Sequence, residues 1–582
     1  MTRIGSPVAP DDQSTPERHD LQAGGVSAAG SIVMAVAGSA PAYSIAATTA
    51  ALVGVAGLGA PAALLWCGIP MLGIAWAFLY LGRADVNAGA AYSWVARALH
   101  PALGFLSGWA LVISATIFMV AGALPAGAMT VSLFDPSQAE NVPLITGIGA
   151  IWFVIMAACV YFGVHITARA QWIMSTIEVG ILVVFAALAL FRAATTSHDG
   201  PDFSWDWLGF SHLTGPGIFV GAALIAAFYY WGWDVSSNLN EETTDGHKSA
   251  GAAGLIGVGI VFVLFEIFTI ATLIMLSQEQ IEANSANILS VLGDVIWPGL
   301  GGKILIIAVA LSTIATLETT LIQVTRSLFA MGRDHTIPRA FGRVHPRWKT
   351  PTFATIVILV VSLLLFVGSN FLGSVGDIME NAILSIGLQI AFYYTLAGVA
   401  VVVAYRRVLF RSVKNFLLIG LWPASGAVFM GWAFFASIPS NDPIVNWLGI
   451  GLIVLGVVPL ALFYRKAKVY YSRRPLEVPP ELDRKAPADI DLRSPEQVET
   501  LPDPNTTVIK TVDDKQAAEK KKSGCLGPRH PLFSSFRVPV VGVEPTRPFG
   551  QPSLSRSRLP FRHTGRRGPP RVRERPYRRI GR

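Results

Sequence analysis

Charged residues are scarce in this chain of 582 residues: Asp, Glu, Lys and Arg together make up 14%. Soluble proteins carry about 25% charged residues, whereas here 52% of the residues are hydrophobic. The hydrophobic residues gather in stretches of about 20, which is the length that a helix needs to cross a bilayer. This composition excludes an ordinary soluble protein and predicts an all-α polytopic membrane protein.

Cysteine is rare as well, since the chain has only Cys67, Cys159 and Cys525. They form no C-x-x-C pair and no metal-ligand spacing, which excludes a disulfide framework and a cysteine metal site. The sequence also lacks a Walker-type loop, a nucleophile elbow and an H-E-x-x-H motif. We therefore expect no catalytic residue, no metal and no cofactor. Any step that needs energy must draw on an ion gradient.

Lysine is absent from the last sixty residues, yet this segment carries the basic charge of the chain. Residues 523–582 contain fourteen arginines and two acids, a balance of +12, so the net charge of +8 leaves the remainder at −4. The basic balance therefore indicates no nucleic-acid partner for the body of the protein. Residues 1–24 are polar and lack a signal-peptide pattern, so we expect them to form a cytoplasmic N-terminal tail.

The segment after the last apolar run has the composition of a tail. Residues 475–522 are rich in Pro, Asp, Glu and Lys, and we expect residues 467–582 to be a disordered cytoplasmic tail. Within it, the stretch "GVEPTRPFGQPSLSRSRLPFRHTG" resembles the translation of a reading frame that runs over a transfer-RNA gene. We interpret residues 523–582 as a frame artefact or a recent extension, with a basic tail on anionic lipid as the alternative. Deletion of residues 523–582 should leave activity intact.

Twelve apolar spans fill residues 25–466. Short loops on one side of these spans carry most of the Lys and Arg, from Arg83 and Arg97 to Arg411 and Lys414, whereas the opposite loops offer only Arg192 and Lys303. This asymmetry places both termini in the cytoplasm, and we expect the protein to lie in the cell membrane. The spans lie approximately at residues 28–56, 61–82, 104–134, 143–163, 170–192, 215–239, 250–276, 302–331, 352–371, 378–404, 416–437 and 443–464.

The first and sixth spans each contain residues that interrupt a helix. The first carries "AVAGSAPAYS", in which Pro41 lacks an amide hydrogen and follows Gly38 and Ser39. The sixth carries "YYWGWD", with Gly232 and Asp234 inside an apolar run. If residues 28–192 and 215–404 are two repeats, the interruptions fall at equivalent positions. The alternative is that glycine and proline are simply common in membrane helices.

Three further stretches give the chain a family resemblance. "NAGAAYSWVARALHPALGFLSGW" (residues 87–109), "FYYWGWD" and "TRSLFAMGRDHTIPRAFGRVHPRWKTP" (residues 325–351) resemble, in order, motifs of the amino acid–polyamine–organocation (APC) permeases. The resemblance covers about residues 25–465. It implies a LeuT-type fold, a five-plus-five inverted repeat with extra helices at residues 416–464. It also implies alternating access around two broken helices.

The resemblance and the interruptions together predict a substrate site. Freed amides near Gly38, Ser39, Ala40 and Pro41 would hold a substrate carboxylate. Aromatic and backbone groups at the second interruption would receive an amine and close the path. These groups belong to Tyr230, Trp231 and Gly232, with Trp231 as the gate. The chain departs from the family in having Ala40 where Gly is usual and Asp234 where Glu is usual, which puts substrate size and specificity in question.

Four residues are candidates for coupling to an ion. An acid at bilayer depth is costly unless it faces the bundle interior. By resemblance, Asp234 would couple proton and substrate movement. Glu178 stands where some family members carry a lysine, and our hypothesis is that it is protonatable or faces a bound cation. Glu318 and Thr319 on the eighth span would lie near the first interruption. The alternatives are a neutral packed Asp234, a Glu178 that ties the first and fifth spans together, and structural roles for the others. The acids of the loop "NEETTDGHKS" are expected to pair locally.

We therefore predict a secondary active transporter of amino acids or related amines, coupled to protons. The partners are the substrate, the proton and the lipid bilayer. Sodium-coupled symport and substrate exchange are the alternatives within transport. A membrane-embedded enzyme or a channel is a remote alternative, because no nucleophile, base or metal constellation is present.

Overall fold

A computed structural model describes residues 20–138, 141–284, 288–369 and 375–479 of the chain. The predicted N-terminal tail up to residue 19 and the tail from residue 480, including the interpretation of residues 523–582, lie outside the described residues. The described residues belong to one compact unit.

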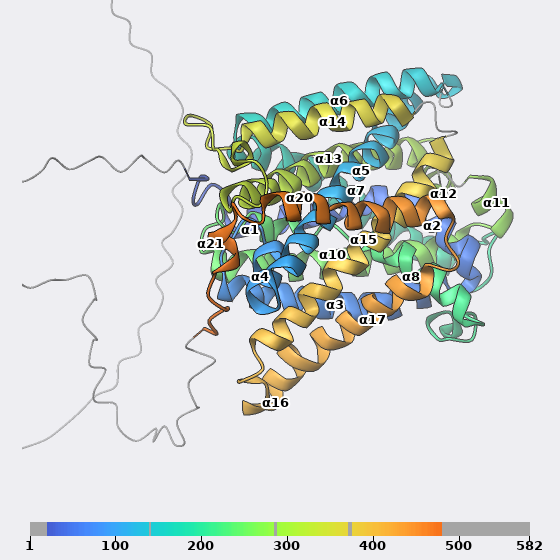
Figure 1. Ribbon diagram of the computed structural model, residues 1–582. Coiled ribbons are helices and arrows are strands. Elements are labelled where there is room, and N and C mark those ends of the chain that lie inside the picture. Colours follow the sequence, from blue (N-terminus) through green and yellow to red (C-terminus); the bar gives the residue numbers. More distant parts are fainter. Residues whose placement is uncertain (1–19, 139–140, 285–287, 370–374, 480–582) are drawn as a thin grey trace, which may run out of the picture. The chain divides into compact units, whose positions relative to one another are not determined.

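The described residues form helices, and the one β-bridge among them joins Val26 to Thr243. This observation confirms the predicted all-α class (Figure 1). In chain order the helices are α1 (Ala28–Ser39), α2 (Pro41–Ala56), η1 (Gly57–Gly59), α3 (Ala60–Ala84), α4 (Ala91–Ala98), α5 (Pro101–Phe134), η2 (Pro136–Gln138), α6 (Val142–Phe162), α7 (Val164–Thr195), η3 (Trp205–Leu208), α8 (Pro216–Tyr229), α9 (Val235–Asn238), α10 (Gly246–Met275), α11 (Gln278–Ala283), α12 (Ile288–Ile296), α13 (Gly301–Arg333), η4 (Arg339–Gly342), α14 (Thr352–Ser369), α15 (Val375–Ala404), η5 (Leu409–Arg411), α16 (Val413–Asn415), η6 (Phe416–Leu421), α17 (Trp422–Ser437), α18 (Pro443–Asn446), η7 (Trp447–Gly451), α19 (Leu452–Leu455), α20 (Val457–Phe463) and α21 (Lys468–Tyr471).

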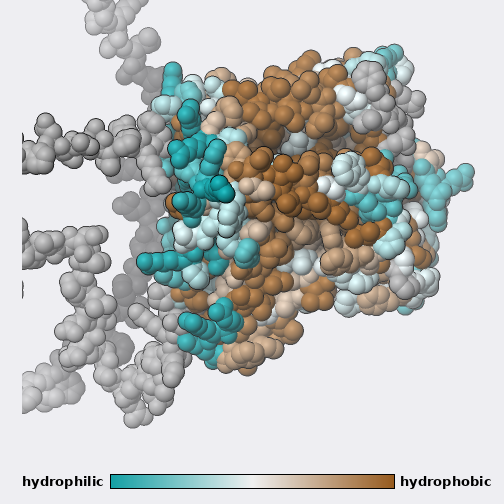
Figure 2. Space-filling view, in the orientation of Figure 1, coloured by the Kyte–Doolittle hydropathy of each residue, from teal (hydrophilic) through white to brown (hydrophobic). Residues whose placement is uncertain are grey.

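Ten helical segments in the described part of the chain are long and apolar enough to cross a membrane. The first of them, Ala28–Ala84, contains α1, α2 and α3 in a run of 57 residues, and Gly217–Tyr229 is a further, shorter apolar helix. Figure 2 shows a broad hydrophobic band between two hydrophilic ends. The protein is therefore a multi-pass membrane protein. The count of twelve spans and the inverted repeat remain predictions.

The helices differ in how much of their surface is buried by the rest of the protein. In α13, 83% of the most apolar stretch is buried, whereas in Pro443–Phe463 only 22% is buried. A helix that is apolar on all sides and buried lies at the centre of a bundle, and one that stays exposed faces lipid. α13 packs on α5, α7, α12 and both halves of the first interrupted segment, α1 and α2. α6 and α14 pack on each other at one edge (Figure 1).

The last described residues pack on the helical body. The composition predicts a disordered tail from residue 467, but residues 468–471 form α21, and Tyr470 is buried. The ring of Tyr470 stacks on Tyr92 of α4 with centroids 4.9 Å apart, and its hydroxyl donates to the Pro101 carbonyl at 2.9 Å. Arg473 pairs with Asp334. Charge and proline content predict a tail here, because composition does not show that the single ring of Tyr470 is buried.

Candidate functional site

The first interruption separates α1 from α2. α1 ends at Ser39, Ala40 takes a left-handed conformation with φ 47° and ψ 63°, and α2 begins at Pro41. Proline at the first position of a helix is favourable because its missing N–H needs no partner there. Inside one continuous helix the same ring would clash with the preceding turn. The sequence predicts an interruption in this span, and the helix bounds agree with it.

Side chains from two other helices hold the polar groups that this interruption frees. The N–H of Ala42 donates to Oε1 of Glu178 on α7 at 3.0 Å. The N–H of Tyr43 donates to Oγ of Ser312 on α13 at 3.1 Å. The Ala40 N–H donates to carbonyls within α1, and Pro41 has no N–H. The amides near residues 39–42 that the sequence analysis assigns to a substrate carboxylate are therefore already bonded within the protein.

The second interruption lies between α8 and α9. α8 ends at Tyr229, Gly232 has φ 96°, and α9 begins only at Val235. Such a positive φ is easy for glycine and strained for other residues. Among the described residues, no acceptor bonds the N–H of Gly232 or of Trp233. The free amides of this region therefore lie at the second interruption.

The two interruptions touch through their glycines. A Cβ atom on Gly38 would lie 2.2 Å from the Gly232 carbonyl oxygen, and a Cβ on Gly232 would lie 2.1 Å from the Gly38 carbonyl oxygen. Both distances are far inside van der Waals contact. The Gly38 carbonyl also accepts from Oγ1 of Thr316 on α13 at 3.1 Å. Backbone thus meets backbone where the two broken helices cross, and any side chain at either glycine would separate them.

Asp234 belongs to a buried hydrogen-bonded chain. Its side chain has no exposed surface, and Oδ2 accepts from the hydroxyl of Tyr393 on α15 at 2.9 Å. That hydroxyl in turn accepts from Nε1 of Trp231 at 2.7 Å. Oδ1 of Asp234 has no partner among the described residues. One carboxyl oxygen is therefore left to bind a proton or to accept a hydrogen bond from a ligand.

Trp231 and Tyr230 face different surroundings. The Trp231 ring meets Phe118 of α5 edge-on at 5.5 Å, and Phe118 also contacts Tyr43 at 6.0 Å. Trp231 therefore lies in an aromatic cluster that reaches the first interruption. The Tyr230 hydroxyl instead donates to the Leu64 carbonyl on α3 at 3.2 Å, and its ring stacks on Phe262. The structure places Tyr230 away from the contact of the two interruptions.

The candidate coupling residues on α7 and α13 lie in different parts of the structure. Glu178 is buried at the start of α2, where a helix N-terminus favours negative charge, and its Oε2 has no partner among the described residues. Glu318 accepts from Nε2 of Gln171 on α7 at 2.6 Å. The Thr319 hydroxyl donates to carbonyls of its own helix. The structure brings Glu178 to the first interruption, and Glu318 and Thr319 make their contacts elsewhere.

Ser312, Thr316 and Tyr393 contact the interruptions, and the sequence analysis does not name them. Ser312 and Thr316 are four residues apart, so they lie on one face of α13. The sequence does not show which face of α13 meets α1. By spacing alone, Thr319 and Thr320 are equally good candidates. No sequence pattern around Tyr393 indicates that it belongs to the site. Its relation to Asp234 arises only from packing.

The expectation that the acids of the loop after α9 pair locally is wrong. Glu242 makes a bidentate pair with Arg326 of α13 at 2.9 and 3.0 Å, and both side chains are buried. Glu241 pairs with Arg333 at 2.7 Å and is partly exposed. The two arginines lie seven positions apart, two turns along α13, so one face of that helix receives both acids.

The chain also resembles known proteins over most of its length. The family described as amino acid permease matches residues 24–460. This chain belongs to that family. The expected membership of the APC permeases is thereby confirmed, and the multi-pass fold is that of a transporter of amino acids or amines.

Relatives of this permease carry different substrates. It is 25% identical over 411 residues to the low-affinity putrescine importer PlaP of Escherichia coli, covering 68% of this chain and 85% of that protein. It is 22% identical over 399 residues to the serine/threonine exchanger SteT of Bacillus subtilis, covering 67% and 84%. It is 24% identical over 429 residues to the human large neutral amino acids transporter small subunit 2, covering 71% and 75%. The family alone therefore leaves the substrate class open between amino acids and amines.

Proposed function

We propose that this permease is a proton-coupled secondary transporter whose preferred substrate is an amine without a carboxylate, such as a short diamine. The observation that carries the proposal is the use of the first interruption's amides by Glu178 and Ser312. A zwitterionic amino acid needs donors for its carboxylate, and these donors are already bonded.

The acceptors near the interruptions suit a cation. Glu178 and Asp234 each keep one buried carboxyl oxygen without a partner among the described residues. Glu178 bonds Ala42, one turn from Gly38, and Asp234 lies two residues after Gly232. A buried carboxylate is costly unless a cation or a proton compensates it. An ammonium group carries a positive charge, which compensates the carboxylate, and three N–H donors, which can bond its free oxygen.

Coupling follows from the same two acids. When an amine pairs with one of these acids, a proton on the other neutralises the remaining buried charge, so proton and substrate would be carried together. We propose that the Trp231–Tyr393–Asp234 chain transmits the state of Asp234 to the aromatic ring that closes the path. Sodium coupling is the alternative, in which freed carbonyls and hydroxyls rather than the two acids would hold the ion.

Transport would proceed by alternating access, with the two interruptions as the fixed centre of a LeuT-type five-plus-five repeat of twelve spans. Both termini would lie in the cytoplasm, as the loop charges predict, and the membrane would be the cell membrane. The site would comprise Gly38, Ser39, Ala40 and Pro41 on one side. Trp231, Gly232 and Asp234 would form the other side, and Tyr230 would support α3 and α10.

A second candidate is the exchange or uptake of a zwitterionic amino acid. The specific observation in its favour is the pair of free amides at Gly232 and Trp233, which could bond a carboxylate. SteT exchanges serine and threonine according to its name, and its similarity extends over 67% of this chain. In this candidate the carboxylate would lie at the second interruption and the amine near Glu178.

A matched ligand pair separates the two candidates. Ornithine differs from 1,4-diaminobutane only by its α-carboxylate, and both can be titrated onto the purified protein while tryptophan fluorescence is followed. We expect the diamine to bind about tenfold or more tightly than ornithine, because the carboxylate finds no free donor at the first interruption and meets two acids. Tighter binding of ornithine, or of a neutral amino acid, would favour the second candidate and overturn the amine assignment.

A further inference from the structure

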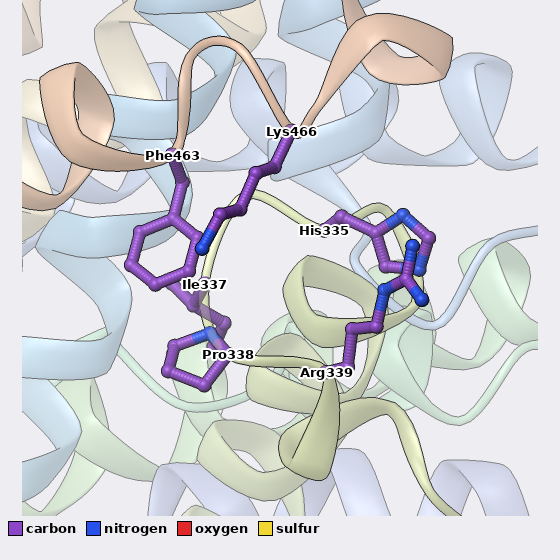
Figure 3. A pocket seen from close by; sticks show the side chains of 6 residues that line it. All are labelled: His335, Ile337, Pro338, Arg339, Phe463 and Lys466. Carbon is purple, nitrogen blue, oxygen red and sulfur yellow. The ribbon is translucent and has the colours of Figure 1, made fainter.

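A basic cavity lies at the end of α20, away from the interruptions. It has a volume of about 580 Å³ and is formed by the loop after α13 together with the end of α20 and the turn that follows. In Figure 3 the side chains of Lys466 and Phe463 lie on one side, and those of His335 and Arg339 lie together on the other. Its lining residues are His335, Ile337, Pro338, Arg339, Phe463 and Lys466.

The basic groups of this cavity have no acidic partner among the described residues, and the Lys466 ammonium lies over the Phe463 ring at 5.3 Å from its centroid. No acid lines the cavity, and in the part of the chain that the structure describes none of its three basic side chains belongs to an ion pair. The neighbouring acid Asp334 is already paired with Arg473. Two arginine or lysine groups and an imidazole around one hollow form an anion site, because each donates hydrogen bonds and none accepts when charged.

Three of the six lining residues of the cavity are apolar. Ile337, Pro338 and Phe463 line it between the basic groups. The candidate membrane span Pro443–Phe463 ends here, and on its last turns Val458 and Leu462 are 52% and 69% exposed. A headgroup held in the cavity could therefore keep its acyl chains against α20. Basic pockets at the ends of membrane helices bind phospholipid headgroups in this manner.

The backbone places one of the basic side chains at a conformational cost. His335 follows the last turn of α13 with φ 61°, where the Thr336 N–H bonds the Met331 carbonyl at 3.0 Å. This is the left-handed position of a helix C-cap, which glycine usually occupies. Folding alone is served better by glycine here, so the imidazole that lines the cavity indicates a use other than stability.

We propose that this cavity binds a phosphate-bearing anion, supplied either by the headgroup of an anionic phospholipid or by a soluble phosphate ester. The bound anion joins the end of α13 to the turn between α20 and α21. It thereby holds the C-terminal segment on the helical body.

The test uses the full-length protein purified in a neutral detergent, with thermal unfolding and native mass spectrometry as readouts. The probes are phosphatidylglycerol, phosphatidylcholine as the zwitterionic lipid, and glycerol 1-phosphate as the soluble ester. The variant is Arg339→Gln/Lys466→Gln. The matched control is Arg343→Gln/Lys468→Gln, which removes two exposed charges from the same segments outside the cavity.

We expect phosphatidylglycerol to stabilise the wild type and the control alike and to bind the cavity variant roughly 25-fold more weakly, at about fivefold for each charge lost. His335→Gly should weaken binding while leaving the unfolding temperature without lipid unchanged or raised, because glycine relieves the left-handed strain. Stabilisation by glycerol 1-phosphate at the same residues would identify a soluble ester as the source. The proposal is overturned if neither probe stabilises, if phosphatidylcholine acts as well as phosphatidylglycerol, or if the control loses as much binding as the cavity variant.

Discussion

At the scale of single residues, the hydroxyl of Tyr393 has two roles at once. It donates to Asp234 and accepts from Trp231, so an acid and a ring that are three positions apart on the chain are joined through a third helix. A buried donor or acceptor that loses its partner costs about 1–3 kcal/mol. The orientation of Trp231 and the surroundings of Asp234 therefore depend on one another.

Tyr393→Phe removes both hydrogen bonds with little change in shape, and we expect it to lower uptake at least about tenfold, since about 1.4 kcal/mol is a factor of ten. Asp234→Asn should retain folding and lose the response of uptake to an imposed proton gradient. The measurement is uptake of labelled 1,4-diaminobutane into proteoliposomes. Tyr405→Phe is the matched control, because its buried hydroxyl donates to the Tyr80 carbonyl at 2.7 Å and its loss also removes a tyrosine hydrogen bond. Unchanged rate and pH dependence in Asp234→Asn would remove the coupling role.

Glu178→Gln separates charge from structure. The amide oxygen of glutamine can still accept from the Ala42 N–H, so the tie between α7 and the first interruption is kept and only the charge is lost. We expect the KM for a diamine to rise about tenfold or more, because an ammonium loses an ionic partner. Concentrative uptake that matches the wild type would mean that Glu178 only ties the two helices together.

At the scale of elements, the proposed transport site depends on how closely the two broken helices approach each other. Pro41 and Gly232 indicate the interruptions from sequence, because each residue has a direct effect on the backbone. What holds the freed groups could not be predicted, since Glu178 and Ser312 lie 136 and 269 positions from the residues that they bond at the first interruption. Local rules describe where a helix ends, and packing decides which side chain meets the end.

Gly38→Ala and Gly232→Ala test that contact. Each Cβ would fall within 2.2 Å of a backbone oxygen, so the helices must separate, and we expect uptake to fall to background while the protein still inserts. Gly54→Ala is the control, because a Cβ there meets no atom within 4 Å. Size-exclusion profiles establish folding for all three variants. Wild-type uptake by both Gly38→Ala and Gly232→Ala would show that the close approach is not needed for transport.

At the scale of the whole molecule, a buried ion pair joins distant parts of the helical body. Glu242, in the loop after α9, is held by Arg326 of α13, and that loop also pairs with the chain before α1 through the bridge of Val26 and Thr243. Composition predicts the all-α membrane class, and the motifs predict the family. The long-range pairs escape prediction, because adjacent acids such as Glu241 and Glu242 look alike in sequence but differ in burial.

Glu242→Gln should destabilise the protein by about 3–5 kcal/mol, because it leaves the buried Arg326 guanidinium without its counter-charge. Glu241→Gln breaks a partly exposed pair and should cost about 1 kcal/mol or less. Thermal unfolding in detergent compares the two neighbours directly. An equal decrease in unfolding temperature for both variants would contradict the claim that the buried pair contributes more stability than the partly exposed pair.

Uptake by purified protein in liposomes tests the central claim most directly, that two broken helices and their acids carry an amine against its gradient. Labelled 1,4-diaminobutane and labelled ornithine are offered under an imposed proton gradient, an imposed sodium gradient and no gradient. The account predicts that the diamine accumulates above its external concentration with the proton gradient alone, and faster than ornithine. Accumulation that needs sodium or an internal exchange substrate, or a diamine signal equal to that of empty liposomes, would contradict it.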